Sequence, residues 1–334
     1  MRFYNTSPKS LVLQGSPVSS RPRPTLTEVL PLLSTPGLRG AGIAAALATV
    51  LIWSCYFLSL RYGALSPLGT FELTLFRFAV PGLLLTPLMI ARRKRMLAVH
   101  PLWLLGILIG AGLPFFLLSA YAMGLAPVVQ GSTLIPGTAP LFVTALAVLI
   151  FRQPLSNWRI LGLAGIVAGI LCMLAVGGLN ADNMVLRGQL IFLLCSLCWA
   201  LFTLSIRQSG LSALETAAVL TVPSGILLLL YGLISGTGVD FSTVSTGEWL
   251  LQLVVQGLLV GLGAGFLYGF AIHTLGAEVT SAMGSLTPVC ATLLAAVFLH
   301  ENVELTTLLG LSLVTLGVIA ASGLITSSPL HTTG

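Results

Sequence analysis

Residues 106–115 read GILIGAGLPF, and residues 257–266, in the other half of the chain, read GLLVGLGAGF. Both stretches place glycine at the first, fifth and seventh positions and phenylalanine at the tenth. Further matches flank them in the same order: Gly42, Trp53 and Arg61 match Gly188, Trp199 and Arg207, and Pro140, Gly162 and Gly169 match Pro288, Gly310 and Gly317. Three groups of matches in one order predict that the chain is an internal duplication.

The composition is that of a membrane protein. Of the 334 residues, 56% are hydrophobic and 7% are charged, and the mean hydropathy is +1.03. A soluble domain carries about 25% charged residues, and a membrane-spanning helix needs about 20 apolar ones. We therefore predict an all-α membrane protein with ten transmembrane helices, at approximately 41–60, 68–90, 102–123, 128–150, 158–177, 188–206, 213–234, 249–271, 279–299 and 305–325.

The ten predicted spans divide into two five-helix repeats, residues 41–178 and 186–325. Because five is an odd number, the second repeat enters the membrane from the side opposite the first, so the repeats are predicted to be inverted. A basic tail rich in Ser, Pro and Thr, residues 1–40, precedes them and is expected to be disordered. A short tail, residues 326–334, follows them.

The distribution of positive charge predicts the orientation. Twelve of the 15 Lys and Arg residues fall in the N-terminal tail or on its side of the membrane, Arg61 and Arg187 fall on the other side, and Arg77 lies within a span. The positive-inside rule then makes both termini cytoplasmic, in the inner (plasma) membrane. The cluster from Arg92 to Arg95 is placed to contact anionic membrane lipid. Basic residues scattered between apolar runs argue against nucleic acid as a partner.

Several short motifs, taken in order, resemble the EamA-type family of the drug/metabolite transporter superfamily. They are Ile52-Trp53-Ser54, Phe76-Arg77-Phe78, Ala139-Pro140-Leu141-Phe142, Thr287-Pro288-Val289 and Leu299-His300-Glu301. The resemblance covers about residues 41–325 and implies a ten-helix secondary carrier, often an exporter of amino acids or other small metabolites, with its path between the repeats. Family members commonly place Glu after the fourth helix, where this chain has Arg152-Gln153-Pro154.

Aromatic and hydroxyl residues recur on one face of the first and sixth predicted spans. Steps of three or four residues place Thr49, Trp53 and Tyr56 on one helix face, and the same holds for Ser196, Trp199 and Thr203. Such faces predict a central cavity lined by indoles and hydroxyls, and simple helix packing is the alternative for each aromatic residue. The candidate substrate-path residues are Trp53, Tyr56, Gln130, Trp199, Thr203 and Tyr268.

Arg77 and Glu72 are the candidate intramembrane charges. A lone cation in a span costs about 2.5–3.5 kcal/mol, so Arg77 needs a partner. Glu72 lies five residues away, about 140° around the helix, and the two do not share a face. We expect Arg77 to be anchored by a polar group of another helix, and the alternative is a carboxylate on the substrate. A proton-coupling role for Glu72 or His273 is a further hypothesis.

No catalytic residue, metal site or cofactor is indicated by the sequence. All five cysteines lie in apolar segments, and His300-Glu301 lacks the second histidine of a zinc-binding helix. No phosphate-binding loop is present, so energy coupling to protons or to solute exchange is expected. We predict a non-enzymatic secondary active transporter, an exporter of small organic metabolites. An intramembrane lipid-modifying enzyme and a channel or sensor with the carrier fold are the alternatives, and a homodimer is left open.

Overall fold

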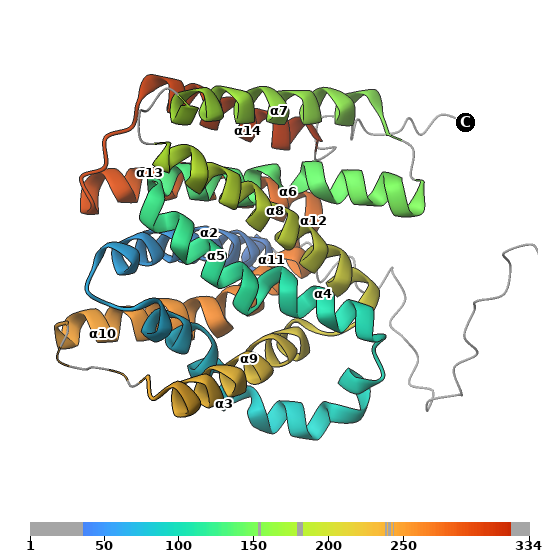
Figure 1. The fold of residues 1–334 in the computed structure, drawn as a ribbon. Helices are drawn as coiled ribbons and strands as arrows, with labels where there is room; N and C mark the ends of the chain where they lie inside the picture. The colour runs from blue at the N-terminus through green and yellow to red at the C-terminus, as the bar shows by residue number, and fades with distance from the viewer. Residues whose placement is uncertain are drawn as a thin grey trace, which may run out of the picture.

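The computed structural model describes residues 36–321, except 153–154, 179–182, 238, 240–241 and 243. Within these residues the chain is almost entirely helical and has no strand (Figure 1). Nine helical segments there are long and apolar enough to cross a membrane, and the apolar helix α14 (Leu305–Ala321) is a tenth. The prediction of an all-α membrane protein is confirmed. Residues 36–40 of the predicted tail belong to the first helix, whereas residues 1–35 and 326–334 lie outside the described part.

The first half of the chain contains α2 (Pro36–Leu65), α3 (Thr70–Leu97), α4 (Pro101–Ala111), α5 (Leu113–Leu125), α6 (Val128–Phe151) and α7 (Asn157–Gly178). The second half contains α8 (Met184–Ser209), α9 (Ala213–Ser235), α10 (Thr246–Gln252), the π-helix η1 (Leu253–Gly263), α11 (Ala264–Leu275), α12 (Ala277–Gly284), α13 (Thr287–Phe298) and α14. The third span consists of α4 and α5, the eighth of α10, η1 and α11, and the ninth of α12 and α13.

The packing of the helices repeats when the two halves are exchanged. The fifth spans, α7 and α14, pack together along one edge of the bundle, and the second spans, α3 and α9, pack along the opposite edge (Figure 1). Between these pairs, α2 packs against α11 and α13, and α8 packs against α4, α5 and α6. The first helix of each repeat therefore lies against the third and fourth spans of the other repeat.

Glycine allows the paired spans to approach closely. A Cβ atom built on Gly317 of α14 would lie 2.7 Å from the carbonyl oxygen of Gly162 on α7, and one on Gly169 would lie 2.8 Å from that of Gly310. On the other edge, a Cβ on Gly82 of α3 would lie 2.8 Å from the Thr221 carbonyl oxygen of α9. Helices without side chains at these points gain van der Waals contact along their backbones, which is a principal source of helix association in a membrane.

Three spans are interrupted near their middle. The third span breaks because Gly112 has an extended backbone, with φ −85° and ψ −151°, before Pro114. At the matching glycine of the second repeat, Gly263, the π-helix η1 ends. The ninth span breaks between α12 and α13, just before Pro288, which has no N–H to donate to the carbonyl four residues earlier. Irregular backbone at membrane depth is tolerated only where protein or a cavity surrounds it.

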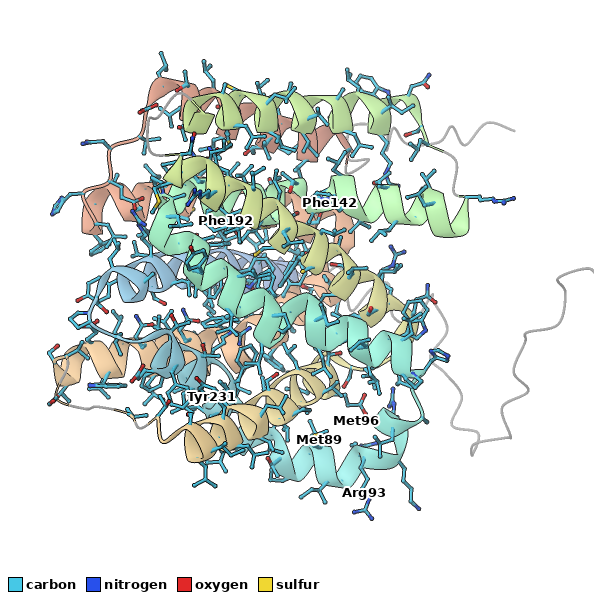
Figure 2. All side chains as sticks on the ribbon, viewed as in Figure 1. Met89, Arg93, Met96, Phe142, Phe192 and Tyr231 are labelled. Atoms are coloured by element: carbon cyan, nitrogen blue, oxygen red, sulfur yellow. The ribbon has the colours of Figure 1, made fainter. Side chains whose placement is uncertain are left out.

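The bundle has two chemically different ends. The Glu301 end contains residues 66–69, 126–127 and 299–304, and the Arg95 end contains residues 98–100, 210–212 and 276. Exposed basic side chains gather at the end of α3 next to the Arg95 end, where Arg93 points away from the bundle (Figure 2). Phe192, in contrast, lies fully buried within the bundle (Figure 2).

Candidate substrate path

Two tryptophans occupy equivalent places between the repeats. The ring of Trp53 on α2 lies 5.0 Å from that of Tyr268 on α11, and the ring of Trp199 on α8 lies 5.6 Å from that of Phe115 on α5. Each pair joins the first helix of one repeat to the third span of the other. Both tryptophans and Tyr268 are only partly buried. The structure thus brings Trp53 and Tyr268 together, as contact partners across the interface between the repeats.

Hydroxyl groups beside these aromatic residues bond to the fourth and ninth spans. Ser54 donates to the carbonyl oxygen of Thr287 at 3.2 Å, at the start of α13. Thr138 of α6 donates to the Ser196 hydroxyl of α8 at 2.7 Å. A Cβ atom on Gly284, at the end of α12, would lie 3.9 Å from the Trp53 ring, so this indole faces the break in the ninth span. The centre of the bundle therefore combines indoles, hydroxyls and an interrupted helix.

Tyr56 of α2 and Arg77 of α3 lie close together. Tyr56 is buried and its hydroxyl lies near Ser119 of α5, whereas Arg77 is partly buried. Arg77 is close enough to Tyr56 for the two groups to interact electrostatically, and Cys195 of α8 lies near the same hydroxyl. The Arg77 guanidinium also lies 5.5 Å from the centre of the neighbouring Phe78 ring. The cation thus lies beside Tyr56 of α2, whose hydroxyl is near residues of α5 and α8.

Gln130 takes part in a different set of contacts. Gln189 of α8 donates to the Gln130 side-chain oxygen at 3.0 Å and to the Met173 carbonyl of α7 at 2.7 Å. Gln130 in turn donates to Thr307 of α14 at 3.5 Å. Both glutamines are buried, so this network joins four spans close to the Glu301 end. The contacts of Gln130 are those of an interhelical link, away from the aromatic pairs.

Thr203 and Glu72 complete the predicted set. Thr203 donates to the Trp199 carbonyl oxygen at 2.8 Å, within its own helix, and is partly buried. Glu72 lies in the first turn of α3 and is partly exposed. A Cβ on Gly69 would collide with its carboxylate, so this group folds back over the start of the helix. An acid at a helix N-terminus is favourable, and that position places Glu72 near a helix end rather than in mid-span.

Two buried glutamines of the eighth span are not among the predicted site residues. Gln252 donates to the Ser59 carbonyl at 3.0 Å, and Gln256 donates to the Ser59 hydroxyl at 2.7 Å. Both side chains are fully buried, and they fix the start of η1 to α2. The signal is visible in the sequence, because the two glutamines interrupt an apolar run with helical spacing.

An ion pair holds the repeats together at the Glu301 end. Arg61 Nε of α2 donates to Glu301 Oε1 at 2.9 Å, and Arg61 also donates to the Met123 carbonyl oxygen. The Val128 N–H, at the start of α6, donates to Glu301 Oε2 at 2.9 Å. The two charged side chains are only 14% and 12% exposed. This cluster ties three segments of the first repeat to the loop before α14 in the second.

Two hollows of the described structure lie outside the aromatic pairs. A small one of about 70 Å³ at the Glu301 end is lined by residues that include Gln130, Val185 and Thr307. A larger one of about 460 Å³ lies between α3, α5 and α9, and its lining is mostly leucine, with Thr70, Phe71, Thr74 and Tyr231. Such an apolar lining suits lipid acyl chains better than a polar solute. No group of three or more His, Cys, Asp or Glu that could hold a metal occurs in the described part of the chain.

Comparison with known proteins bears directly on this geometry. The model of the EamA-like transporter family matches twice, over residues 40–175 and 186–323, and the two matches cover most of the sequence. The chain belongs to the EamA-like transporter family. The two matched copies correspond to the two repeats, and the family membership makes this EamA-like chain a transporter of the drug/metabolite type in the membrane.

The curated relatives of this EamA-like protein are named as transporters. The uncharacterized transporter YoaV of Bacillus subtilis (strain 168) is 25% identical over 283 residues, which cover 81% of this chain and 93% of the relative. The uncharacterized transporter YyaM of the same organism is 26% identical, and the matched region covers 58% of this chain and 64% of the relative. A solved crystal structure shares the fold, with a TM-score of 0.57 and 18% identity over 86% of this chain and 99% of its own.

Proposed function

We propose that the protein is a secondary active exporter of small organic metabolites, amino acids or related compounds, that works by alternating access. The observation that carries the proposal is the exchange of equivalent contacts between the repeats, in which Trp53 packs on Tyr268 and Trp199 packs on Phe115. Because inverted copies have nearly equal energies, the two arrangements of such an interface can interconvert about one central site.

The proposed path runs between the repeats, past the partly buried Trp53, Trp199 and Tyr268. Indole and phenol rings offer flat apolar surfaces with a polar edge, which suits a small solute that has both characters. The interruption of the ninth span at Leu286, beside Trp53, supplies a flexible point and free carbonyl groups. Gln130 and Thr203 already have hydrogen-bond partners within the bundle, so we assign them to holding the helices around this path rather than to contact with the solute.

The orientation follows from the basic residues. The exposed side chains of Arg92, Arg93 and Lys94 mark the Arg95 end, and the positive-inside rule assigns that end to the cytoplasm. Both termini are then cytoplasmic, and the membrane is the inner (plasma) membrane. The lipid surface at this end is a partner through the same basic cluster. Cysteine labelling of intact cells tests this orientation, because an impermeant reagent should reach residue 302 and not residue 93.

Energy coupling is proposed to come from protons or from exchange with a second solute. The sequence has no phosphate-binding loop for ATP, and Glu72 and His273 are the titratable groups proposed for a proton route. A protonophore added to cells should collapse export if protons drive it. Export that persists at the full rate with a protonophore would leave solute exchange as the driving process.

The decisive experiment compares metabolites inside and outside cells that lack or overproduce the protein. A transported solute should be depleted inside the overproducing cells, enriched in their medium, and retained in the cells that lack the protein. No solute would behave in this way if the protein were an intramembrane enzyme that modifies lipid. Stepwise currents in planar bilayers would favour a channel over the carrier proposed.

Variants of the aromatic residues then test the path. Trp53→Ala and Trp199→Ala should reduce export of the identified solute at least tenfold at equal protein levels, because each removes one side of the central aromatic lining. Trp103→Ala, near the Arg95 end of α4, is the matched control and should keep most of the flux. Equal losses in all three variants would assign the two indoles to packing and reject the proposed path.

A further inference from the structure

Arg77 lies on the face of α3 that looks into the bundle. On one side of it along the helix surface, the Leu73 side chain packs on Gly63 of α2, where an added Cβ atom would lie 2.6 Å from Leu73 Cδ2. On the other side, Phe78 packs edge-on against Phe116 of α5, with ring centres 5.6 Å apart. The opposite face of α3, at Ala79 and Gly82, lies against α9. Arg77 thus lies on the side of α3 that packs against α2, α5 and η1, away from α9.

Within the described part of the chain, Arg77 has no hydrogen bond or ion pair. The other two partly buried arginines are both satisfied: Arg61 pairs with Glu301, and Arg159 donates twice to the Thr144 hydroxyl, at 3.2 and 3.0 Å. Arg95 is exposed and lies 3.6 Å from Glu215. Glu72 lies at the start of α3 with its carboxylate over Gly69. The polar group of another helix that lies nearest to Arg77 is the Tyr56 hydroxyl of α2, and it makes no hydrogen bond to the guanidinium.

The surroundings of Arg77 can bind an anion but cannot neutralise the cation. The polar group beside Arg77 is the hydroxyl of Tyr56, and Ser119 and Cys195 lie next to that hydroxyl; all three residues are buried. Hydroxyls donate to a carboxylate as readily as they accept, whereas no acid of the described residues is paired with Arg77. A partly buried cation within a membrane span and without a counter-charge indicates a functional site, because a structural cation would have an acidic or carbonyl partner.

The aromatic pairs continue directly from this point. Tyr56 is one helical turn from Trp53 on α2, and Ser119 is one turn from Phe115, the partner of Trp199, on α5. A molecule bound at Arg77 therefore reaches the proposed path within one turn on both helices. The rest of such a molecule would lie against indole and phenyl rings.

The charge is present in only one repeat. Glu72 is the third residue of α3 and Glu215 is the third residue of α9, and these are the second spans of the two repeats. Five residues after each glutamate, α3 has Arg77 and α9 has Leu220. Among the described residues, the pair of second spans consequently offers one cation, which matches one negative charge on a solute.

We propose that Arg77 binds the carboxylate of the transported solute, and that the solute is a monocarboxylate with a flat or apolar body. The guanidinium accommodates the two carboxylate oxygens side by side, and the Tyr56 hydroxyl is placed to donate to one of them. This inference rests on the proposed transport function and adds the class of solute and the residue that selects it.

The test uses cells that overproduce the wild-type protein, Arg77→Gln, Arg77→Lys or the matched control Arg187→Gln, whose arginine is exposed at the start of α8. All metabolites in the medium and in the cells are measured, and protein level and melting temperature are measured for each variant. The wild type should export solutes that carry one carboxylate. Arg77→Gln should lower that export at least tenfold, Arg77→Lys should retain part of it, and Arg187→Gln should match the wild type.

The outcomes separate this inference from the transport proposal. If no solute shifts in wild-type cells, the transport function itself is rejected. If the exported solutes carry no carboxylate, or carry a phosphate or a second carboxylate, transport stands and the assignment of a monocarboxylate is overturned, whether or not any variant folds. If folded Arg77→Gln exports monocarboxylates at the wild-type rate, Arg77 is not their binding residue. A competition assay with phenylacetate and the neutral phenylacetamide adds a direct check, because only the acid should slow export.

Discussion

Replacement of Arg61 by Gln should open the bundle at the Glu301 end. Arg61 contributes a 2.9 Å ion pair to Glu301 and a hydrogen bond to Met123, and both partners of the pair are shielded, with 14% and 12% of their side chains exposed. Glu301 belongs to the second repeat, and Arg61, Met123 and Val128 belong to the first. Separation of the repeats at this end must therefore break the pair.

The size of the effect follows from the burial. Exposed ion pairs contribute about 0.2–1 kcal/mol, and breaking a fully buried pair costs about 3–5 kcal/mol. A pair with this intermediate shielding is expected to stabilise the closed arrangement by about 2 kcal/mol. Since about 1.4 kcal/mol is a tenfold change in an equilibrium, the variant should raise the ratio of open to closed molecules by about thirtyfold.

A single introduced cysteine can report this ratio. Ser119 is fully buried beside Tyr56 and lies six residues before the end of α5 at the Glu301 end, so opening of that end exposes it. Ser119→Cys is placed in a background without the five native cysteines, and its labelling by an impermeant maleimide is followed in intact cells, where the reagent reaches the protein only from the Glu301 end, proposed to face outward. Labelling should be about thirtyfold faster with Arg61→Gln or Glu301→Gln, and the double variant should resemble the single ones.

Glu304→Gln is the matched control for this experiment, because Glu304 is an exposed acid of the same loop. It should leave the labelling rate of the introduced cysteine unchanged. Rates for Arg61→Gln and Glu301→Gln that equal the parent rate, in folded protein, would refute the reasoning. So would an equal acceleration in Glu304→Gln, since the effect would then come from loop charge rather than from the ion pair.

Two further predictions concern stability, measured as the melting temperature in detergent. Gly317→Ala should lower the free energy of unfolding by about 2 kcal/mol, because its Cβ would overlap the backbone of α7, whereas Gly269→Ala, where nothing lies within 4 Å, should change it by less than about 0.5 kcal/mol. Comparable melting temperatures for these two variants would show that α7 and α14 are not in close contact. Gln189→Leu should lower the free energy of unfolding by about 1 kcal/mol, because the hydrogen bonds to Gln130 and Met173 are lost. Gln208→Leu, at an exposed position on the same helix, is the control and should leave the free energy of unfolding unchanged. An unchanged melting temperature in Gln189→Leu would show that this network does not stabilise the bundle.

The spans themselves are predictable from the sequence because hydropathy alone demands them. The first span, predicted at 41–60, is observed as Pro36–Leu65, and the second, predicted at 68–90, as Thr70–Leu97. The differences lie at the ends, where helices continue beyond the apolar core as far as capping permits. The internal match between residues 106–115 and 257–266 likewise predicts the two copies that the family comparison finds.

The interruptions and side-chain partners are less predictable. The break at Gly112 has a local signal, since Gly112-Leu113-Pro114 disfavours a continuous helix, but the π-helix η1 depends on how Gln252 and Gln256 reach Ser59 on another span. Gln130 is predicted in the substrate path because its polarity is visible in the sequence. Its partner Gln189 is 59 residues away and cannot be inferred, because only tertiary packing brings the two together.

The departures from symmetry make the two ends of the bundle unequal. In a perfect inverted duplication the two arrangements of the repeats would be equal in energy, and neither end would be favoured as closed. Here Glu301, after the ninth span, pairs with Arg61. The corresponding exit of the fourth span begins with the exposed Arg152 in place of an acid. Arg207, the counterpart of Arg61 in the second repeat, is also exposed and joins neither ion pair of the described residues. Arg95 and Glu215 join the repeats at the other end, but their distance is 3.6 Å and the arginine is exposed, so that pair contributes less. We therefore propose that the Arg61–Glu301 pair biases the protein towards closure at the Glu301 end. With the Arg95 end in the cytoplasm, as proposed, that bias leaves Arg77 to be loaded from the cytoplasm, which is the order of events that an exporter requires.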